Sequence, residues 1–156
     1  MVGITLEQQL RNLLRSLHDQ GILDLNFENV RRARARWDSQ CLIEAVTALI
    51  DDLDVSMAET AGLMNLDEPE LDYETLDCYI HQLQERSASI GGCRMVVACR
   101  NSQQAIDAKD KARCVETFEQ VKQEYQTLRD ALNNFLQLER YIMAYENRRN
   151  GAQGSA

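Results

Sequence analysis

The chain has 156 residues, a length that suits one compact domain and leaves no room for two catalytic domains. Hydrophobic residues make up 44% of it and charged residues 27%, which excludes intrinsic disorder as its main state. The formal net charge of −8, from 17 basic and 25 acidic side chains, disfavours duplex nucleic acid and anionic membrane surfaces as partners.

The first part of the chain predicts two helices. Leucines recur at helical spacing between residues 5 and 19 and predict an amphipathic helix there, with Gly21 as its stop. Asp24 is suited to cap a short second helix that carries Phe27 and Val30.

The middle of the chain predicts two longer helices separated by a loop. Apolar residues from Leu42 to Leu53 mark a third helix, which begins after Asp38 or Ser39 and runs to about Met64. Residues 65–72 contain the only proline and form the clearest loop. A fourth helix should start at about residue 72 and end near the glycine pair at 91–92.

The last part of the chain predicts a fifth helix and a long sixth one. The fifth carries apolar residues from Met95 to Ile106. In the sixth, apolar residues are mostly spaced three and four apart, the pattern of a helix packed in a bundle. They are Phe118, Val121, Tyr125, Leu128, Leu132, Phe135 and Ile142.

These elements predict an all-α fold, an antiparallel four-helix bundle built on helices three to six, with two additional N-terminal helices packed over one end. We expect one domain over residues 1–148 and a flexible C-terminal tail over residues 149–156, whose end is small and polar. The N-terminus lacks the apolar core of a signal peptide, and no segment approaches a membrane span. We therefore expect no membrane insertion, no nucleic-acid partner, and a cytoplasmic and nuclear location.

Several residue clusters favour structural over chemical roles. The arginines at 31, 32, 34 and 36 favour a solvated helix face over an anion-binding patch. The aspartates at 51, 52 and 54 lack the glycine and glutamate of a calcium loop and favour a solvated acidic face. Five cysteines form no CxxC pair and predict reduced core thiols rather than zinc ligands or disulfides. They are Cys41, Cys78, Cys93, Cys99 and Cys114.

Only two histidines can act as nucleophiles, acids or ligands near neutral pH. His18 lies at a predicted helix end, where a cation complements the helix dipole. His81 lies between apolar positions on the fourth helix, at the edge of its buried face. Helix geometry stacks four side chains above and below it, those of Asp77, Cys78, Gln84 and Glu85. Phosphate-loop, HExxH and GxSxG motifs are absent, and no histidine pair has metal-ligand spacing.

The segment LDCYIHQLQERSASIG at residues 76–91 resembles the signature of plant histidine-containing phosphotransfer proteins, which reads HQLKGSS followed by a small residue and SIG. Three further segments are similar to family segments. They are QGILDLNF at 20–27, EAVTALIDD at 44–52 and FLQLERYIMAY at 135–145. Chain length and helix order agree as well.

The resemblance implies that His81 accepts a phosphoryl group from the receiver domain of a hybrid histidine kinase and passes it to the receiver of a response regulator, typically in cytokinin signalling. The protein would be a phosphoryl carrier rather than a stand-alone enzyme, with no cofactor or metal site of its own, because the partner receiver supplies Mg²⁺. The pocket around the histidine is expected to contain Asp77, Gln82, Gln84, Glu85 and Ser87. A hydrophobic docking surface is expected at Leu23, Phe27, Leu49 and Leu53.

The signature departs from the family pattern next to the histidine. Gln84 replaces the lysine whose ammonium neutralises phosphoryl charge, and Glu85 replaces a glycine that leaves the imidazole open. Arg86 replaces a serine and lies roughly 140° around the helix from His81, so it is badly placed to compensate. The alternatives are therefore a pseudo-phosphotransfer protein that binds receivers without efficient relay and dampens signalling, or a helical scaffold whose histidine is incidental.

Overall fold

The computed structural model describes residues 2–35, 39–66 and 70–154, and these ranges contain six helices and no strand. The predicted all-α fold is therefore confirmed. The helices are α1 (Val2–Asp19), α2 (Leu25–Ala35), α3 (Ser39–Met64), α4 (Tyr73–Ser89), α5 (Cys93–Asp107) and α6 (Lys111–Gly154). None of the helices in these ranges is long and apolar enough to cross a membrane.

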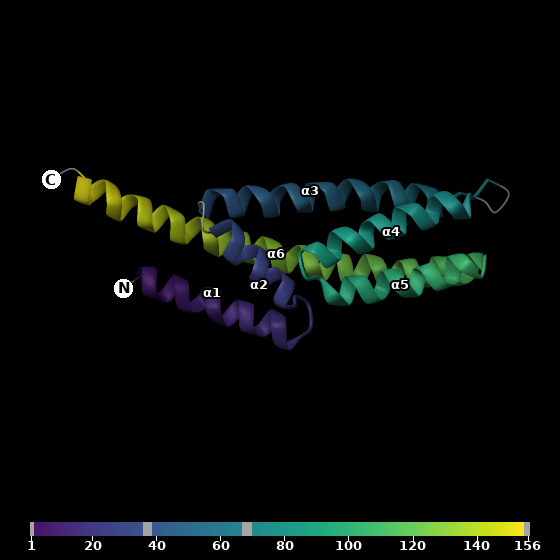
Figure 1. Ribbon diagram of the computed structural model, residues 1–156, viewed down its shortest axis with the longest axis horizontal. Coiled ribbons are helices and arrows are strands. Elements are labelled where there is room, and N and C mark those ends of the chain that lie inside the picture. Colours follow the sequence, from purple (N-terminus) through teal and green to yellow (C-terminus); the bar gives the residue numbers. More distant parts are fainter. Residues whose placement is uncertain (1, 36–38, 67–69, 155–156) are drawn as a thin grey trace.

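Helices α3 to α6 form the predicted bundle, and the two N-terminal helices pack at one end of it (Figure 1). Helix α4 packs against both α3 and α5, while α6 packs against α3 and α5. Helix α2 covers α3 and α4, and α1 lies against α6. Helix α6 runs past the bundle, so the start of α1 and the end of α6 lie at the same end of the molecule (Figure 1).

Side-chain caps explain where two of the helices begin. The carboxylate of Asp72 accepts hydrogen bonds from the backbone N–H groups of Glu74 and Thr75, at 3.0 and 3.4 Å. Asp24 does the same for α2, since its Oδ1 lies 2.8 Å from the backbone nitrogen of Asn26. These contacts satisfy amides that the first turn of a helix leaves without partners, and the cap at Asp24 is the one that the sequence predicts.

The glycine pair between α4 and α5 ties this turn to the start of α2. Gly91 has a φ of +81°, which side chains other than glycine rarely adopt. A Cβ atom there would lie 2.7 Å from the backbone nitrogen of Phe27. The carbonyl of Gly91 also accepts a hydrogen bond of 2.8 Å from the backbone of Asp24. A glycine therefore allows α2 to close over the α4–α5 turn.

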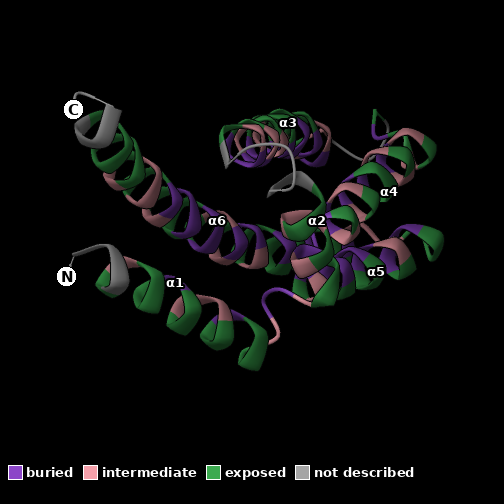
Figure 2. Ribbon diagram, turned by 60° about the vertical axis from the view of Figure 1, so that its left-hand side comes forward, coloured by how far each residue is buried: buried purple, intermediate pink, exposed green. Residues whose placement is uncertain are grey.

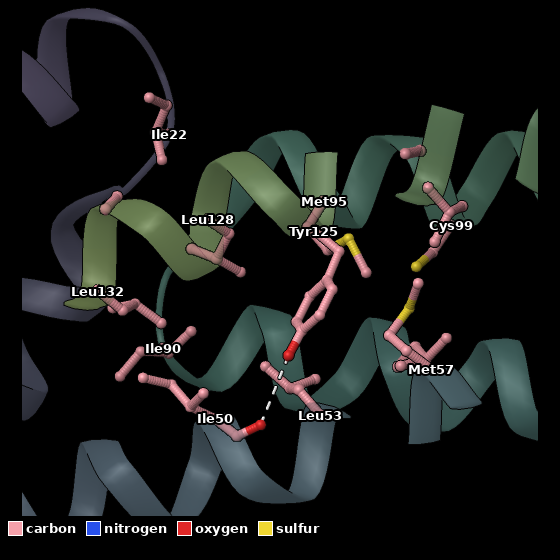
Figure 3. Close-up of a cluster of buried hydrophobic side chains, with 14 of the residues drawn as sticks. Ile22, Ile50, Leu53, Met57, Ile90, Met95, Cys99, Tyr125, Leu128 and Leu132 are labelled. Atoms are coloured by element: carbon pink, nitrogen blue, oxygen red, sulfur yellow. Dashed lines mark hydrogen bonds between the residues drawn. The ribbon is translucent and has the colours of Figure 1, made fainter. Parts of the chain in front are cut away.

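The core contains the predicted apolar residues of α6, which are buried from Phe118 to Phe135, while Ile142 is half-buried where α6 leaves the bundle. Phe135 meets Phe27 of α2 edge to face, with ring centroids 5.0 Å apart. In Figure 3 the hydroxyl of Tyr125 points from α6 towards the carbonyl of Ile50 on α3, at 3.5 Å. Aromatic side chains thus join α6 to α2 and α3.

The C-terminal part of α6 extends beyond the predicted domain boundary at residue 148. The helix continues to Gly154, and residues 146–151 are all exposed (Figure 2). The residues expected to begin the tail are therefore helical but do not pack on the bundle. The division of the chain at this point stays a prediction.

The cysteines are all free, but they do not all lie in the core. Cys99 and Cys114 are buried, and burial raises the pKa of the Cys99 thiol to about 12. Cys41 and Cys93 are half-buried and Cys78 is exposed, so the expectation of a core thiol is wrong for Cys78. Cys78 lies on the outer face of α4, one turn before His81.

Candidate functional site

His81 lies at the middle of α4 on the surface of the bundle, with 57% of its side chain exposed. Three residues on the opposite face of the helix, Leu76, Ile80 and Leu83, are fully buried and hold α4 against the core. The imidazole therefore stands on a rigid element and is open to a partner. The expected partial exposure of His81 is what the structure shows.

Both ring nitrogens of His81 have a polar neighbour. The Nε2 atom lies 3.0 Å from Oε1 of Glu85, the residue one turn further along α4. The Nδ1 atom lies 3.5 Å from the amide nitrogen of Gln103 on α5. An ionised carboxylate only accepts hydrogen bonds, so Nε2 carries a proton in this arrangement. A nitrogen that carries a proton has no free lone pair with which to attack phosphorus.

Gln103 differs from Glu85 in what it can offer the ring. Its amide has an N–H end that donates and a carbonyl end that accepts. In one orientation it donates to a lone pair on Nδ1, and after a half-turn it accepts a hydrogen bond from a protonated Nδ1. The glutamine therefore suits either neutral form of the imidazole. Release of Nε2 for chemistry depends on movement of Glu85, whose side chain is 69% exposed and free to rotate away.

The residues expected around His81 are placed unequally. Glu85 contacts the ring, while Gln82 is exposed and points to the solvent side of the helix. Asp77 and Gln84 are half-buried, one turn before and after His81, on the edge of α4 that faces α5. The Oε1 atom of Gln84 is buried and has no hydrogen-bond partner among the residues that the structure describes.

Ser87 does not belong to this site, so that expectation is wrong. Six residues place it about 240° around α4 from His81. Its side chain is fully buried, and its hydroxyl has no hydrogen-bond partner within the described part of the chain. Arg86 also points elsewhere, because Nη1 donates a hydrogen bond to the hydroxyl of Ser56 on α3. Arg86 therefore supplies no charge to His81, as its angle on the helix predicts.

Most of the residues expected in the hydrophobic docking surface are buried. Leu23, Phe27 and Leu53 are buried, with exposed fractions of 4%, 2% and 0%, and only Leu49 is partly exposed. Their burial has a clear cause, since α2 closes over the bundle end and carries Phe27 into contact with Phe135. Among the described residues, the exposed large apolar side chains are Leu25, Val55, Val97, Val115 and Tyr141.

Gln103 is the residue of the site that the sequence reasoning missed. It comes from α5, and the spacing of residues within one helix cannot identify it. The turn at residues 91–92 carries a signal, because His81 and Gln103 are equally far from Gly92 along the chain. In an antiparallel helix pair joined there, two such residues lie at the same level.

The other charged clusters are engaged elsewhere or form no site. Arg129 of α6 pairs with Asp54 at 3.0 Å, and its hydrogen bond lowers the pKa of that carboxyl. Arg31 and Arg32 both lie near Glu28, while Arg36 falls outside the described residues. Over residues 2–35, 39–66 and 70–154, no three His, Cys, Asp or Glu side chains are grouped to hold a metal ion.

Comparison with known proteins finds relatives that match most of the chain. The chain is 31% identical over 147 residues to histidine-containing phosphotransfer protein 2 of Oryza sativa subsp. japonica, covering 94% of this chain and 97% of that relative. It is 28% identical over 137 residues to pseudo histidine-containing phosphotransfer protein 2 of the same species, covering 88% and 89%. No protein-family model matches the chain.

A solved structure agrees as well. An X-ray structure of a histidine-containing phosphotransfer protein from rice matches with a TM-score of 0.84 at 29% identity, covering 92% of this chain and 99% of that one. The similarity in sequence and in fold extends over nearly the whole chain. This chain belongs to the family of plant histidine-containing phosphotransfer proteins.

Proposed function

We propose that this protein relays a phosphoryl group through His81 between receiver domains of hybrid histidine kinases and of response regulators. The observation that carries the proposal is the exposed imidazole of His81 at the middle of a helix whose opposite face is fully buried. A partner domain can approach such a ring without unfolding any part of the bundle. The protein then acts as a phosphoryl carrier and not as a stand-alone enzyme.

The chemistry requires one unprotonated ring nitrogen. In the forward step the lone pair of that nitrogen attacks phosphorus of an aspartyl phosphate on the receiver. The new P–N bond forms, the P–O bond breaks, and the electron pair leaves with the aspartate carboxylate. In the second step an aspartate carboxylate oxygen of another receiver attacks the phosphorus. A new P–O bond forms, the P–N bond breaks, and its electron pair returns to the ring nitrogen. If Nε2 is the attacking atom, Glu85 must first swing away and the ring proton must sit on Nδ1. The side-chain oxygen of Gln103 can accept a hydrogen bond from that N–H group once the amide has turned over.

The charges around His81 favour a slow relay. The phosphoryl group in flight spreads negative charge over its oxygens, and the side chains one turn away are Glu85, Asp77 and the uncharged Gln84. A carboxylate facing that group raises the barrier, whereas a cation would lower it. We therefore infer transfer that is slower than in relatives that have lysine and glycine at positions 84 and 85.

Mg²⁺ belongs to the partner in this proposal. The charge of a divalent cation would offset the negative oxygens, and the acidic residues that hold it lie in the receiver. The residues of this chain supply the nucleophile, its orientation and the docking surface. The cytokinin-type pathway and the cytoplasmic and nuclear location are parts of the same proposal, which rest on the family signature.

The alternative function is a receiver-binding protein that dampens signalling without efficient relay. The contact of 3.0 Å between Glu85 and Nε2 of His81 favours it, because it occupies the reactive edge of the ring. Similarity to a relative named a pseudo phosphotransfer protein also supports it. The two functions differ in one measurable property, which is whether His81 acquires phosphate from a phosphorylated receiver.

The experiment is a transfer assay with a receiver domain carrying labelled aspartyl phosphate and Mg²⁺. Acid-labile label on the wild-type protein and its absence from the His81→Gln variant support the relay. Binding of the receiver without any label on His81 supports the alternative. His18→Gln is the matched control, because it removes the second histidine and should leave the label unchanged.

A further inference from the structure

The phosphoryl group on His81 needs a positive partner that position 84 does not supply. Its oxygens carry about −2 charge near neutral pH, and a docked receiver would exclude water from them, which makes an unpaired charge costly. The neighbours on α4 are carboxylates at 77 and 85 and an amide at 84. A cation from another helix would solve this problem.

The described cations of α4 and α5 are three arginines, apart from the histidine itself. Two of them are already engaged on other helices. Arg86 donates to the hydroxyl of Ser56 on α3, and Arg94 pairs with Glu124 of α6 at 2.9 Å. Arg100 of α5 is exposed and makes no hydrogen bond or ion pair with any residue that the structure describes.

The register between α4 and α5 places Arg100 between the level of His81 and the glycine turn at residues 91–92. The contact of 3.5 Å between His81 and Gln103 shows that these two residues lie at one level. Arg100 precedes Gln103 by three residues, which shares its face of α5 and shifts it about 4.5 Å along the axis. Because α4 and α5 are antiparallel (Figure 1), this shift leads towards the glycine turn, as does the step from His81 to Glu85.

The register therefore places Arg100 at about the same level along the bundle axis as Glu85. The Nε2 atom points to Glu85, so a phosphoryl group on Nε2 would occupy the space where the carboxylate now lies. Cys99, next to Arg100, faces the core, whereas Arg100 itself and Gln104 are exposed along the outer edge of α5. The long arginine side chain can cross this edge to reach phosphoryl oxygens on α4.

We propose that Arg100 binds the phosphoryl oxygens on His81 and supplies the positive charge that Gln84 lacks. This inference rests on the proposed function of His81 and adds a phosphoryl-binding residue to it. The planar guanidinium presents paired N–H groups that match two phosphoryl oxygens, so one arginine can replace one lysine. Arg100 transfers no proton and takes no part in making or breaking the bonds to phosphorus. It stabilises the negative charge on the phosphoryl oxygens.

The test uses two phosphoryl donors, so that failure of the relay and failure of this inference are distinguishable. The first donor is a receiver carrying aspartyl phosphate with Mg²⁺. The second is phosphoramidate, a small donor whose P–N bond breaks with release of ammonia as the bond to the imidazole forms. Label on His81 is measured for wild type, Arg100→Gln, Arg100→Lys and Arg113→Gln, with His81→Gln as the blank. Arg113 is an exposed arginine at the start of α6.

We expect Arg100→Gln to slow labelling of His81 about tenfold with both donors, and Arg100→Lys to fall between it and wild type. Arg113→Gln should match wild type, and binding of an unphosphorylated receiver should change less than twofold in Arg100→Gln. Equal labelling rates for Arg100→Gln and Arg113→Gln would overturn the inference, as would a wild-type His81 that phosphoramidate does not label. A third outcome is that the receiver does not label His81, whereas phosphoramidate labels it and does so more slowly in Arg100→Gln. This outcome would contradict the proposed relay and support the role of Arg100.

Discussion

The carboxylate of Glu85 lies 3.0 Å from Nε2 of His81, on the same exposed face of α4. A residue that replaces a small one in the family signature is thus in direct contact with the candidate nucleophile. The pair is exposed, so its own contribution to stability is small, about 0.5 kcal/mol or less. The consequence of this contact is chemical, because the carboxylate favours a proton on Nε2 of His81 and places a negative charge beside that nitrogen.

Removal of the charge of Glu85 should accelerate phosphotransfer. Glu85→Gln keeps the size of the side chain and removes the repulsion, and we expect single-turnover transfer from a phosphorylated receiver to rise about tenfold. Glu74→Gln, an exposed position earlier on α4, is the matched control and should have the wild-type rate. The Gln84→Lys, Glu85→Gly double variant should be faster than Glu85→Gln. Identical rates for Glu85→Gln and wild type would show that the carboxylate does not oppose transfer.

Replacement of Gln84 should stabilise the bundle. Its buried Oε1 has no hydrogen-bond partner over residues 2–35, 39–66 and 70–154, and such an atom costs about 1–3 kcal/mol. Gln84→Met has nearly the same shape and no polar atom, so the free energy of unfolding should rise by about 1 kcal/mol in urea denaturation. Gln82→Met, at an exposed position on the same helix, should change it by less than about 0.5 kcal/mol. A loss of stability in Gln84→Met would mean that the amide is satisfied after all.

Gly91 and Gly62 should respond to alanine in opposite directions. At Gly91 the positive φ and the close approach of α2 make a Cβ unfavourable, and Gly91→Ala should lower the free energy of unfolding by about 2 kcal/mol or more. Gly62 lies inside α3 with open space around it, so Gly62→Ala should raise it by about 0.5–1 kcal/mol. Chemical denaturation of both variants measures the sign of each change in the free energy of unfolding. Equal changes in the two variants would contradict the close packing of α2 at the α4–α5 turn.

The pair of Asp54 and Arg129 should make a small part of the stability depend on pH. The hydrogen bond from Arg129 lowers the pKa of Asp54, with burial acting in the opposite direction and Tyr125 adding a second hydrogen bond. A carboxyl whose pKa is lowered in the folded state contributes stability above its unfolded pKa of about 4, and that stability disappears as the pH falls through the folded value.

The Asp54→Asn variant tests this dependence. Since the pair is more than a third exposed, solvent screening limits the effect to about 0.5 kcal/mol. Wild type should exceed Asp54→Asn by that amount at pH 7, and the difference should shrink as the pH falls below the unfolded pKa of about 4. A difference that persists unchanged at low pH would assign it to packing rather than to charge.

Local sequence patterns predicted the helices well because each pattern lies within one element. The predicted third helix has the bounds of α3, and α4 begins directly after Asp72, where the fourth helix is expected to start. The position of His81 on the exposed edge follows from its spacing to Ile80 and Leu83 in the same way.

Patterns within one helix do not predict which residues of two helices contact each other. The burial of Leu23 and Phe27 results from closure of α2 over the α4–α5 turn, and the apolar spacing of α2 does not say which surface it covers. Ser87 was assigned to the site because it stands in the signature, although a helix places it on the opposite face. Gln103 required the register of two helices, which only the turn at 91–92 could have indicated.

Single-turnover transfer from a phosphorylated receiver to this protein tests the central claim most directly. The account predicts acid-labile label on wild type and on His18→Gln, and none on His81→Gln. Folding of the blank is checked by circular dichroism, because an exposed side chain such as His81 should not affect the melting temperature. Label that persists on a folded His81→Gln variant, or a wild-type protein that binds the receiver and stays unlabelled, would contradict the claim that His81 relays the phosphoryl group.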